Sequence, residues 1–88
     1  MDDIFKTKHF IVLESLQMRS TFRFYMTDTK KECCLITQRE LAKLLNLSTR
    51  TINVCLMDLK QNGYIDYYSK AYFVTEKGKK FLKEIANI

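Results

Sequence analysis

Residues 37–63, TQRELAKLLNLSTRTINVCLMDLKQNG, predict two short helices joined by a tight turn. The first helix has a start signal in Thr37 and Glu40, because these residue types three positions apart form a capping box. Its apolar residues recur at the spacing of one helix face and are Leu41, Leu44 and Leu45. Ala42, beside that face, is small enough to let a second helix cross closely.

The second helix separates a core face from an exposed face. Asn46 tolerates the left-handed backbone that ends a helix, and Ser48 can cap the helix that follows. The apolar stripe at i, i+3, i+4 and i+7 consists of Ile52, Cys55, Leu56 and Leu59. The other sides carry Thr49, Arg50, Asn53, Val54 and Met57. Gly63 ends this helix, since glycine accepts a left-handed conformation without steric cost.

The segments after Gly63 predict a hairpin and a last helix. Residues 64–68 and 71–75 favour strands because Tyr, Ile, Phe and Val dominate them. Residues 69–70 would form the tip, although a two-residue link usually contains Asn-Gly. Thr75 can cap a helix over residues 76–86, whose apolar stripe is Phe81, Leu82 and Ile85. The lysines expected to face solvent on its other sides are Lys77, Lys79, Lys80 and Lys83.

The first 36 residues predict a helical segment and a connector. Apolar residues at positions 4, 11, 18, 22 and 25 fit one long helix, or two helices broken near residue 20. The alternation within residues 21–26 also fits a strand, but helix is our preferred interpretation. Residues 27–32, TDTKKE, predict a loop, and residues 34–36 a very short strand. This segment is richer in large apolar residues than a single solvent-facing helix needs. These residues either cover the core of their own domain or contact a second subunit.

The run RELAKLLNLSTRTINVCLMDLKQNGYI, followed by YIDYYSKAYFVT and TEKGKKFL, resembles a winged helix-turn-helix DNA-binding domain. The positions that carry the resemblance are Ser48, Thr51, Ile52, Leu56, Gly63 and Ile65. It implies an α+β, mainly α fold with a three-helix core, a short β-hairpin wing and a C-terminal helix. A single domain over residues 1–88 would comprise an N-terminal segment (1–36), the helix-turn-helix (37–62), the wing (63–75) and the C-terminal helix (76–88). The pattern is similar to small stand-alone regulators of archaea, their viruses or plasmids.

The resemblance implies a sequence-specific double-stranded DNA-binding protein, a transcriptional regulator whose helix over residues 48–62 reads the major groove. Arg suits guanine and Asn suits adenine, so the expected base contacts are Thr49, Arg50, Asn53 and Val54. The expected contacts to the DNA backbone are Gln38, Arg39, Ser48, Thr51, Lys60 and Lys70. A solvated turn lysine is an equal interpretation of Lys70. The alternative function is a protein-docking module in a replication or transcription assembly.

Composition and charge narrow the classes of function that the chain can have. A net charge of +5 and a pI near 9.2 favour an anionic partner. A chain of 88 residues has a small core, so we expect a homodimer, with Phe81, Ile85 and Ile88 as one candidate contact.

The chain lacks a nucleophile–base pair and a glycine-rich phosphate loop, so neither an enzyme nor a cofactor is expected. No run approaches the roughly 20 apolar residues of a membrane span, and no signal peptide is present, which predicts a soluble cytoplasmic protein.

The cysteines do not suggest a metal site. The chain has three cysteines and a single histidine, His9, whereas structural zinc needs four ligands at characteristic spacings. Cys33, Cys34 and Cys55 are therefore expected to be reduced, buried thiols. The alternatives are a redox role for the adjacent pair Cys33 and Cys34, or a disulfide between subunits.

Overall fold

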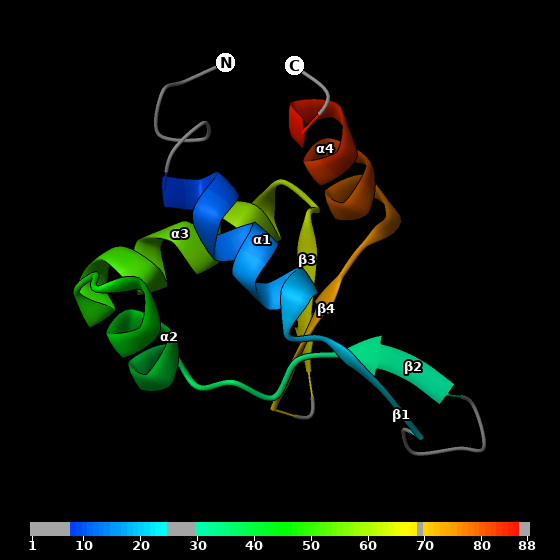
Figure 1. Ribbon diagram of the computed structural model, residues 1–88, viewed down its shortest axis with the longest axis horizontal. Coiled ribbons are helices and arrows are strands. Elements are labelled where there is room, and N and C mark those ends of the chain that lie inside the picture. The colour runs from blue at the N-terminus through cyan, green and yellow to red at the C-terminus, as the bar shows by residue number, and fades with distance from the viewer. Residues whose placement is uncertain (1–7, 25–29, 69, 87–88) are drawn as a thin grey trace.

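Figure 1 shows the computed structural model, which describes residues 8–24, 30–68 and 70–86. The elements in chain order are α1 (Phe10–Met18), β1 (Thr21–Phe24), β2 (Lys30–Cys33), α2 (Gln38–Leu45), α3 (Thr49–Gln61), β3 (Ile65–Tyr68), β4 (Ala71–Val74) and α4 (Glu76–Ala86). Helices α2 and α3 lie on one side of α1, while α4 and the β3–β4 hairpin lie on the other (Figure 1). The predicted α+β fold, with its three-helix core, hairpin and C-terminal helix, is confirmed.

One apolar cluster joins the four helices to the hairpin. Leu13 and Leu16 of α1 and Leu41 of α2 are fully buried in it, together with Ile65 of β3. The predicted stripe of α3 is confirmed, because Ile52, Cys55, Leu56 and Leu59 are each at most 4% exposed. This burial fixes the rotation of α3, so its opposite face is exposed.

Only part of the predicted α2 stripe is buried. Leu41 is fully buried and Leu45 is half-buried, but Leu44 is 46% exposed. Ala42, at 5% exposure, takes the core position instead, because α2 presents its small residue to the core rather than the third leucine. Leu44 therefore lies at the exposed edge of the predicted apolar face.

The signals that begin and end α2 and α3 act as predicted. The Thr37 hydroxyl accepts from the Glu40 backbone N–H at 3.1 Å, and the Ser48 hydroxyl accepts from that of Thr51 at 3.0 Å. Asn46 has φ 55° and Gly63 has φ 78°, both left-handed. After each of them the next N–H reaches back to a helical carbonyl, as in a Schellman motif. The turn between the helices is thus specified locally.

The segment before α2 differs from the prediction. Residues 21–24 form a strand rather than a helix, so our preferred interpretation is wrong there and the strand alternative is correct. Residues 30–32 belong to β2 and not to a loop. The two strands pair antiparallel, from Thr21 opposite Cys33 to Phe24 opposite Lys30. This pairing supplies the backbone hydrogen bonds that local apolar spacing could not reveal. The predictions for residues 4, 25–26 and 27–29 lie outside the described residues.

The β1–β2 hairpin projects away from α2 and α3 (Figure 1). Past its end, Cys34 exchanges two backbone hydrogen bonds of 2.8 Å with Tyr72 of β4. The strand predicted for residues 34–36 is thus reduced to one bridging residue, preceded by β2. The Lys79 ammonium on α4 lies 3.1 Å from the Glu32 carboxylate, which ties β2 to α4. Lys79 is therefore half-buried and not simply solvated.

The C-terminal elements match the prediction closely. Strands β3 and β4 pair from Ile65 opposite Val74 to Tyr68 opposite Ala71. The Thr75 hydroxyl accepts from the Gly78 N–H at 3.0 Å, which confirms the predicted cap of α4. Phe81 is 5% exposed within the core, so its alternative role as a dimer contact is wrong. The side chains of residues 85 and 88 lie outside the described part. Among the helices of residues 8–24, 30–68 and 70–86, none has the length and hydrophobicity of a membrane span.

Candidate nucleic-acid interface

The outward face of α3 carries the side chains predicted to read bases. Thr49, Arg50 and Asn53 are exposed, and Val54 is 49% exposed. Met57, one turn further along, is 52% exposed. The face therefore combines hydrogen-bonding groups with apolar atoms that could meet a thymine methyl.

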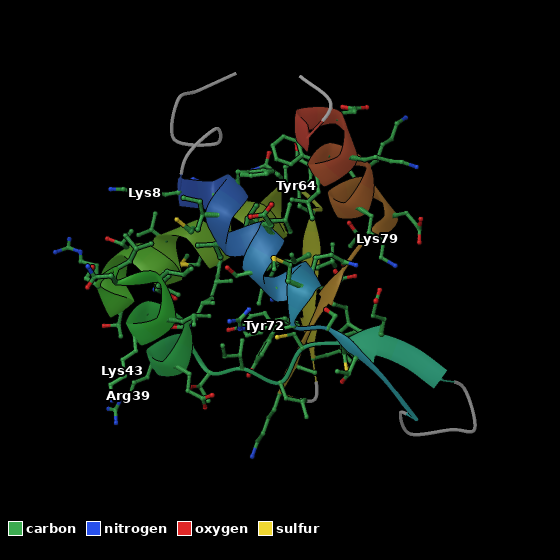
Figure 2. All side chains as sticks on the ribbon, in the orientation of Figure 1. Lys8, Arg39, Lys43, Tyr64, Tyr72 and Lys79 are labelled. Atoms are coloured by element: carbon green, nitrogen blue, oxygen red, sulfur yellow. The ribbon has the colours of Figure 1, made fainter. Side chains whose placement is uncertain are left out.

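Several cations around this face have no acidic partner. Within residues 8–24, 30–68 and 70–86, no ion pair engages Arg39, Arg50, Lys60 or Lys70. Arg39 projects outward from α2, beside Lys43 (Figure 2). Because these charges are not neutralised within the described part of the molecule, they are available to phosphates.

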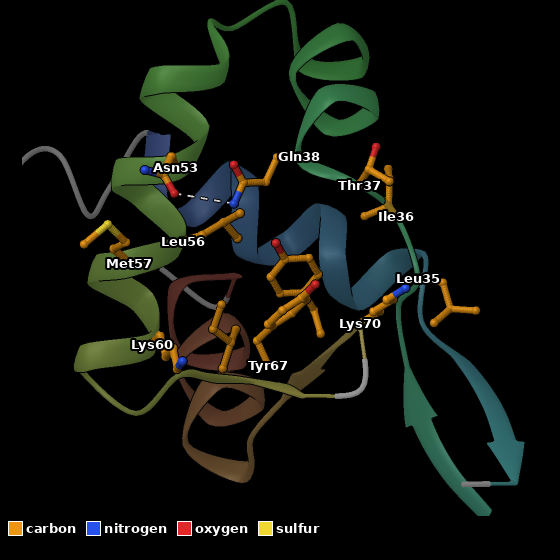
Figure 3. A pocket seen from close by; sticks show the side chains of 12 residues that line it. Leu35, Ile36, Thr37, Gln38, Asn53, Leu56, Met57, Lys60, Tyr67 and Lys70 are labelled. Atoms are coloured by element: carbon orange, nitrogen blue, oxygen red, sulfur yellow. Dashed lines mark hydrogen bonds between the residues drawn. The ribbon is translucent and has the colours of Figure 1, made fainter.

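A groove of about 660 Å³ separates α3 from the β3–β4 hairpin (Figure 3). It brings together four of the predicted DNA contacts, namely Gln38, Asn53, Lys60 and Lys70. Apolar side chains line much of the rest, among them Leu35, Leu56, Met57 and Tyr67. Thr49, Arg50, Val54 and Arg39 do not line this groove. The predicted site thus consists of the outer face of α3 and a groove along one flank.

Gln38 links three elements at this groove. Its Nε2 donates to Asn53 Oδ1 at 3.4 Å (Figure 3). The same side chain hydrogen-bonds the phenol of Tyr72, which is 7% exposed. Burial raises the pKa of Tyr72, and the bond to Gln38 partly offsets this shift. The start of α2 is thereby tied to both α3 and β4.

Ser48 and Thr51 are connected through the cap of α3. The Ser48 hydroxyl accepts from the Thr51 N–H and donates to Thr51 Oγ1 at 2.9 Å. A hydroxyl has one hydrogen, so the Ser48 donor is used within the protein, while that of Thr51 is left for a phosphate. Of these two predicted contacts, Thr51 has the better chemistry for an anion.

The hairpin tip places Lys70 at the groove with an unusual backbone. Lys70 has φ 63°, a conformation that non-glycine residues adopt rarely. Nearby, the Tyr67 and Tyr72 rings lie 4.5 Å apart between centroids. The short link predicted for residues 69–70 therefore relies on Lys70 for its left-handed position, and residue 69 lies outside the described part.

On the other flank of α3, the structure adds a residue that sequence reasoning missed. A cavity of about 260 Å³ is lined by Lys8, His9, Arg50, Thr51, Val54 and Cys55. Lys8 precedes α1 and is exposed (Figure 2), and it lines this cavity together with Arg50. Its place depends on how α1 packs on α3, which no local pattern in the sequence reports.

His9 fixes that packing. It is 1% exposed, and its Nε2 lies 2.9 Å from Asp58 Oδ2 on α3. Its Nδ1 lies 3.9 Å from the Cys55 sulfur. These contacts latch the start of α1 to α3, so Lys8 is held near the exposed face of α3.

The three cysteines are free and buried, as predicted. Burial raises the pKa of the Cys34 thiol, and burial with the nearby Asp58 carboxylate raises that of Cys55. A raised pKa disfavours the reactive thiolate, so the geometry gives no support to a redox role for Cys34. Among the residues the structure describes, no group of three His, Cys, Asp or Glu side chains could hold a metal ion.

A comparison with known protein families identifies the family to which this architecture corresponds. The pattern described as winged helix-turn-helix matches residues 26–88, which include α2, α3, the β3–β4 hairpin and α4. No curated protein sequence matches the chain significantly. The match covers well over half of the chain and coincides with the elements that build the interface. The chain belongs to the winged helix-turn-helix family.

Proposed function

We propose that this chain is a sequence-specific double-stranded DNA-binding protein that regulates transcription by placing α3 in the major groove. One observation carries the proposal: α3 buries its apolar stripe completely while Arg50 and Asn53 remain exposed on its other face. A helix with this division can enter a groove without exposing the core. Family membership independently supports DNA binding.

Base reading falls to the N-terminal half of α3. Arg50 can donate two hydrogen bonds to the O6 and N7 atoms of guanine. Thr49 and Asn53 can bond base edges, and the half-exposed Val54 can contact a thymine methyl. These contacts discriminate sequences, whereas phosphate contacts set the register of the helix.

Phosphate binding falls to the flanks of α3. Arg39, Lys60 and Lys70 are exposed cations, with Thr51 as a hydroxyl donor. Gln38 and Ser48 contribute chiefly through the starts of α2 and α3, where backbone N–H groups attract anions. Lys8 adds a cation on the flank opposite Lys60 and Lys70. Contacts on both flanks would hold α3 symmetrically between two DNA strands.

The test is a selection of bound sequences from random duplex DNA with the purified full chain. We expect an enriched motif, and binding that weakens steeply with salt because counterions are released from phosphates. Binding without an enriched motif would contradict sequence reading, and no duplex binding at low salt would contradict the proposal altogether.

We further propose that residues 1–88 act as one domain and bind as a homodimer to a pseudo-palindromic site. The single cluster that joins all four helices supports the first statement. Ile11 and Met18 of α1 are 43% and 73% exposed, which leaves apolar surface for a second copy. Half-sites would then lie one DNA turn apart, roughly 34–36 Å.

A protein-docking module in a replication or transcription assembly is the second candidate. It is favoured by the exposure of Leu44 on α2 and of Val54 and Met57 on α3, since apolar side chains also suit a protein partner. Retained binding to a protein assembly by a chain that shows no salt-dependent duplex binding would support this candidate over the first.

A further inference from the structure

We propose that Gln38, anchored by Tyr72, orients the Asn53 carboxamide so that its NH₂ group, not its oxygen, faces the DNA and selects guanine. The inference rests on the proposed function, because it concerns how the exposed face of α3 reads one base pair. It assigns Gln38 to positioning a base-reading residue instead of to holding a phosphate through its side chain.

The Gln38 side chain contacts Asn53 of α3 on one side and Tyr72 of β4 on the other. Its position at the first residue of α2 places it across the groove from Asn53, whose Oδ1 accepts from Gln38 Nε2 at 3.4 Å. Behind it, the nearly buried Tyr72 phenol holds the same carboxamide. Tyr72 is itself fixed by two backbone hydrogen bonds to Cys34 and by its ring contact with Tyr67. Gln38 therefore connects the exposed Asn53 side chain to a buried tyrosine of the hairpin.

The Gln38 carboxamide is engaged on both sides within the protein. Its Nε2 donates to Asn53 Oδ1 at 3.4 Å, and the same side chain hydrogen-bonds the Tyr72 phenol. A carboxamide held by two neighbours is better suited to orienting Asn53 than to reaching a phosphate.

The consequence for Asn53 is a change in what it offers the groove. An unrestrained asparagine reads adenine with both ends of its carboxamide, since Oδ1 accepts from N6 and Nδ2 donates to N7. With Oδ1 held toward Gln38, the outward group is Nδ2 and its two hydrogens. Guanine presents two acceptors, O6 and N7, in the major groove, so it is the best partner for a group that only donates. The Gln38 bond thus converts an adenine reader into a guanine reader.

The experiment repeats the selection from random duplex DNA with the full-length wild type, Asn53→Ala, Gln38→Met and Gln38→Glu. Asn53→Ala identifies the base pair that Asn53 reads, because the preference flattens there. Gln38→Met keeps length and helix propensity but frees the carboxamide of Asn53. In Gln38→Glu, the new carboxylate can only accept a hydrogen bond, so it binds Nδ2 of Asn53 and leaves Oδ1 of Asn53 facing the DNA. Circular dichroism checks that each variant is folded.

At the position that Asn53→Ala identifies, we expect guanine in the wild type. Gln38→Met should shift the preference toward adenine, and Gln38→Glu toward the amino-bearing bases adenine and cytosine, by about fivefold or more. Adenine already preferred by the wild type, or guanine kept by both Gln38 variants, would overturn the inference while sequence-specific binding stands. A motif that Asn53→Ala leaves unchanged at every position would overturn it too. If the wild type enriches no motif, the proposed function fails first.

Discussion

Arg50 and Lys70 are both exposed cations without an ion-pair partner in the described part of the molecule, yet their positions give them different tasks. Arg50 is on the first turn of α3, where the outward face would meet base edges. Lys70 is at the hairpin tip, beside the groove that separates β3 and β4 from α3. A base contact and a phosphate contact leave different signatures when the charge is removed.

Replacing Arg50 by alanine should relax the sequence preference at one base pair. The loss of a two-bond contact to guanine is expected to cost about 1–3 kcal/mol against the cognate duplex, and less against random duplex. Fluorescence anisotropy with both duplexes measures the difference. Lys80→Ala removes an exposed charge from α4, away from α3, and should leave both affinities near wild type. Equal loss on the two duplexes would show that Arg50 reads no base.

Replacing Lys70 by alanine should weaken all duplexes alike. One fewer phosphate contact is expected to reduce the slope of log affinity against log salt by about 0.9. Lys70→Arg, which keeps the charge and the same backbone demand, should restore the wild-type slope. A salt slope that is the same in Lys70→Ala and wild type would identify Lys70 as a solvated turn residue.

The elements of this fold differ in how far the sequence determines them. For α2 and α3, caps and stops are read from single residues such as Ser48 and Gly63, and the structure agrees. The strands β1 and β2 could not be predicted reliably, because they depend on pairing with each other and their residues also fit helical spacing. The same limit applies to the site. Arg50 and Asn53 follow from the face of one helix, whereas Lys8 and the Gln38–Tyr72 bond arise from tertiary contacts.

Gly78 in the first turn of α4 gives a direct test of element packing. Alanine in a helix usually stabilises by roughly 0.5–1 kcal/mol relative to glycine. Here a Cβ would overlap the Tyr64 carbonyl oxygen and lie 2.9 Å from Val74 Cγ1. We therefore expect Gly78→Ala to lower the free energy of unfolding by about 1–3 kcal/mol, measured by urea denaturation. With Lys80→Ala as the exposed control on α4, equal or greater stability of Gly78→Ala would contradict this packing.

The buried thiols of Cys34 and Cys55 should make stability fall at alkaline pH. Their pKa values are raised by burial, so the unfolded thiols ionise first as pH increases. The buried, protonated thiols contribute fully to the free energy of unfolding below the pKa of an unfolded cysteine, about 8.5. This contribution is lost as the pH rises toward the raised pKa of the thiols in the folded protein. Urea denaturation between pH 7 and 10 should show a shallower decline for Cys55→Ala, by up to about 1.4 kcal/mol per pH unit. Parallel pH curves for the variant and wild type would be inconsistent with a raised thiol pKa.

At the scale of the whole molecule, the proposed DNA-binding surface is centred on α3 and the β3–β4 hairpin, and the candidate dimer contact lies on another element, α1. The exposed cations of this surface are Arg50 and Lys60 on α3 and Lys70 at the hairpin tip. The exposed apolar side chains of α1 are Ile11 and Met18. The separation allows a second copy to bind without covering α3. The burial of Phe81 removes one predicted contact and leaves α1 as the described candidate.

We expect sedimentation equilibrium at micromolar concentration to report a dimer, either free or on a duplex that carries both half-sites. The physical reason is that covering the exposed apolar atoms of α1 releases water, and two half-sites supply a second binding event on the same duplex. A Met18→Lys substitution should shift the equilibrium toward monomer. A monomer in both states for the wild type would exclude the homodimer.

The exposed face of α3 as the DNA-reading surface is tested most directly by mapping backbone amide resonances during titration with the selected duplex. Labelled full-length protein should show its largest chemical-shift changes within residues 48–57 and at Lys70, with small changes in α4. Changes concentrated in α4 and the β1–β2 hairpin, with residues 48–57 unperturbed in the bound state, would contradict the placement of α3 in the groove.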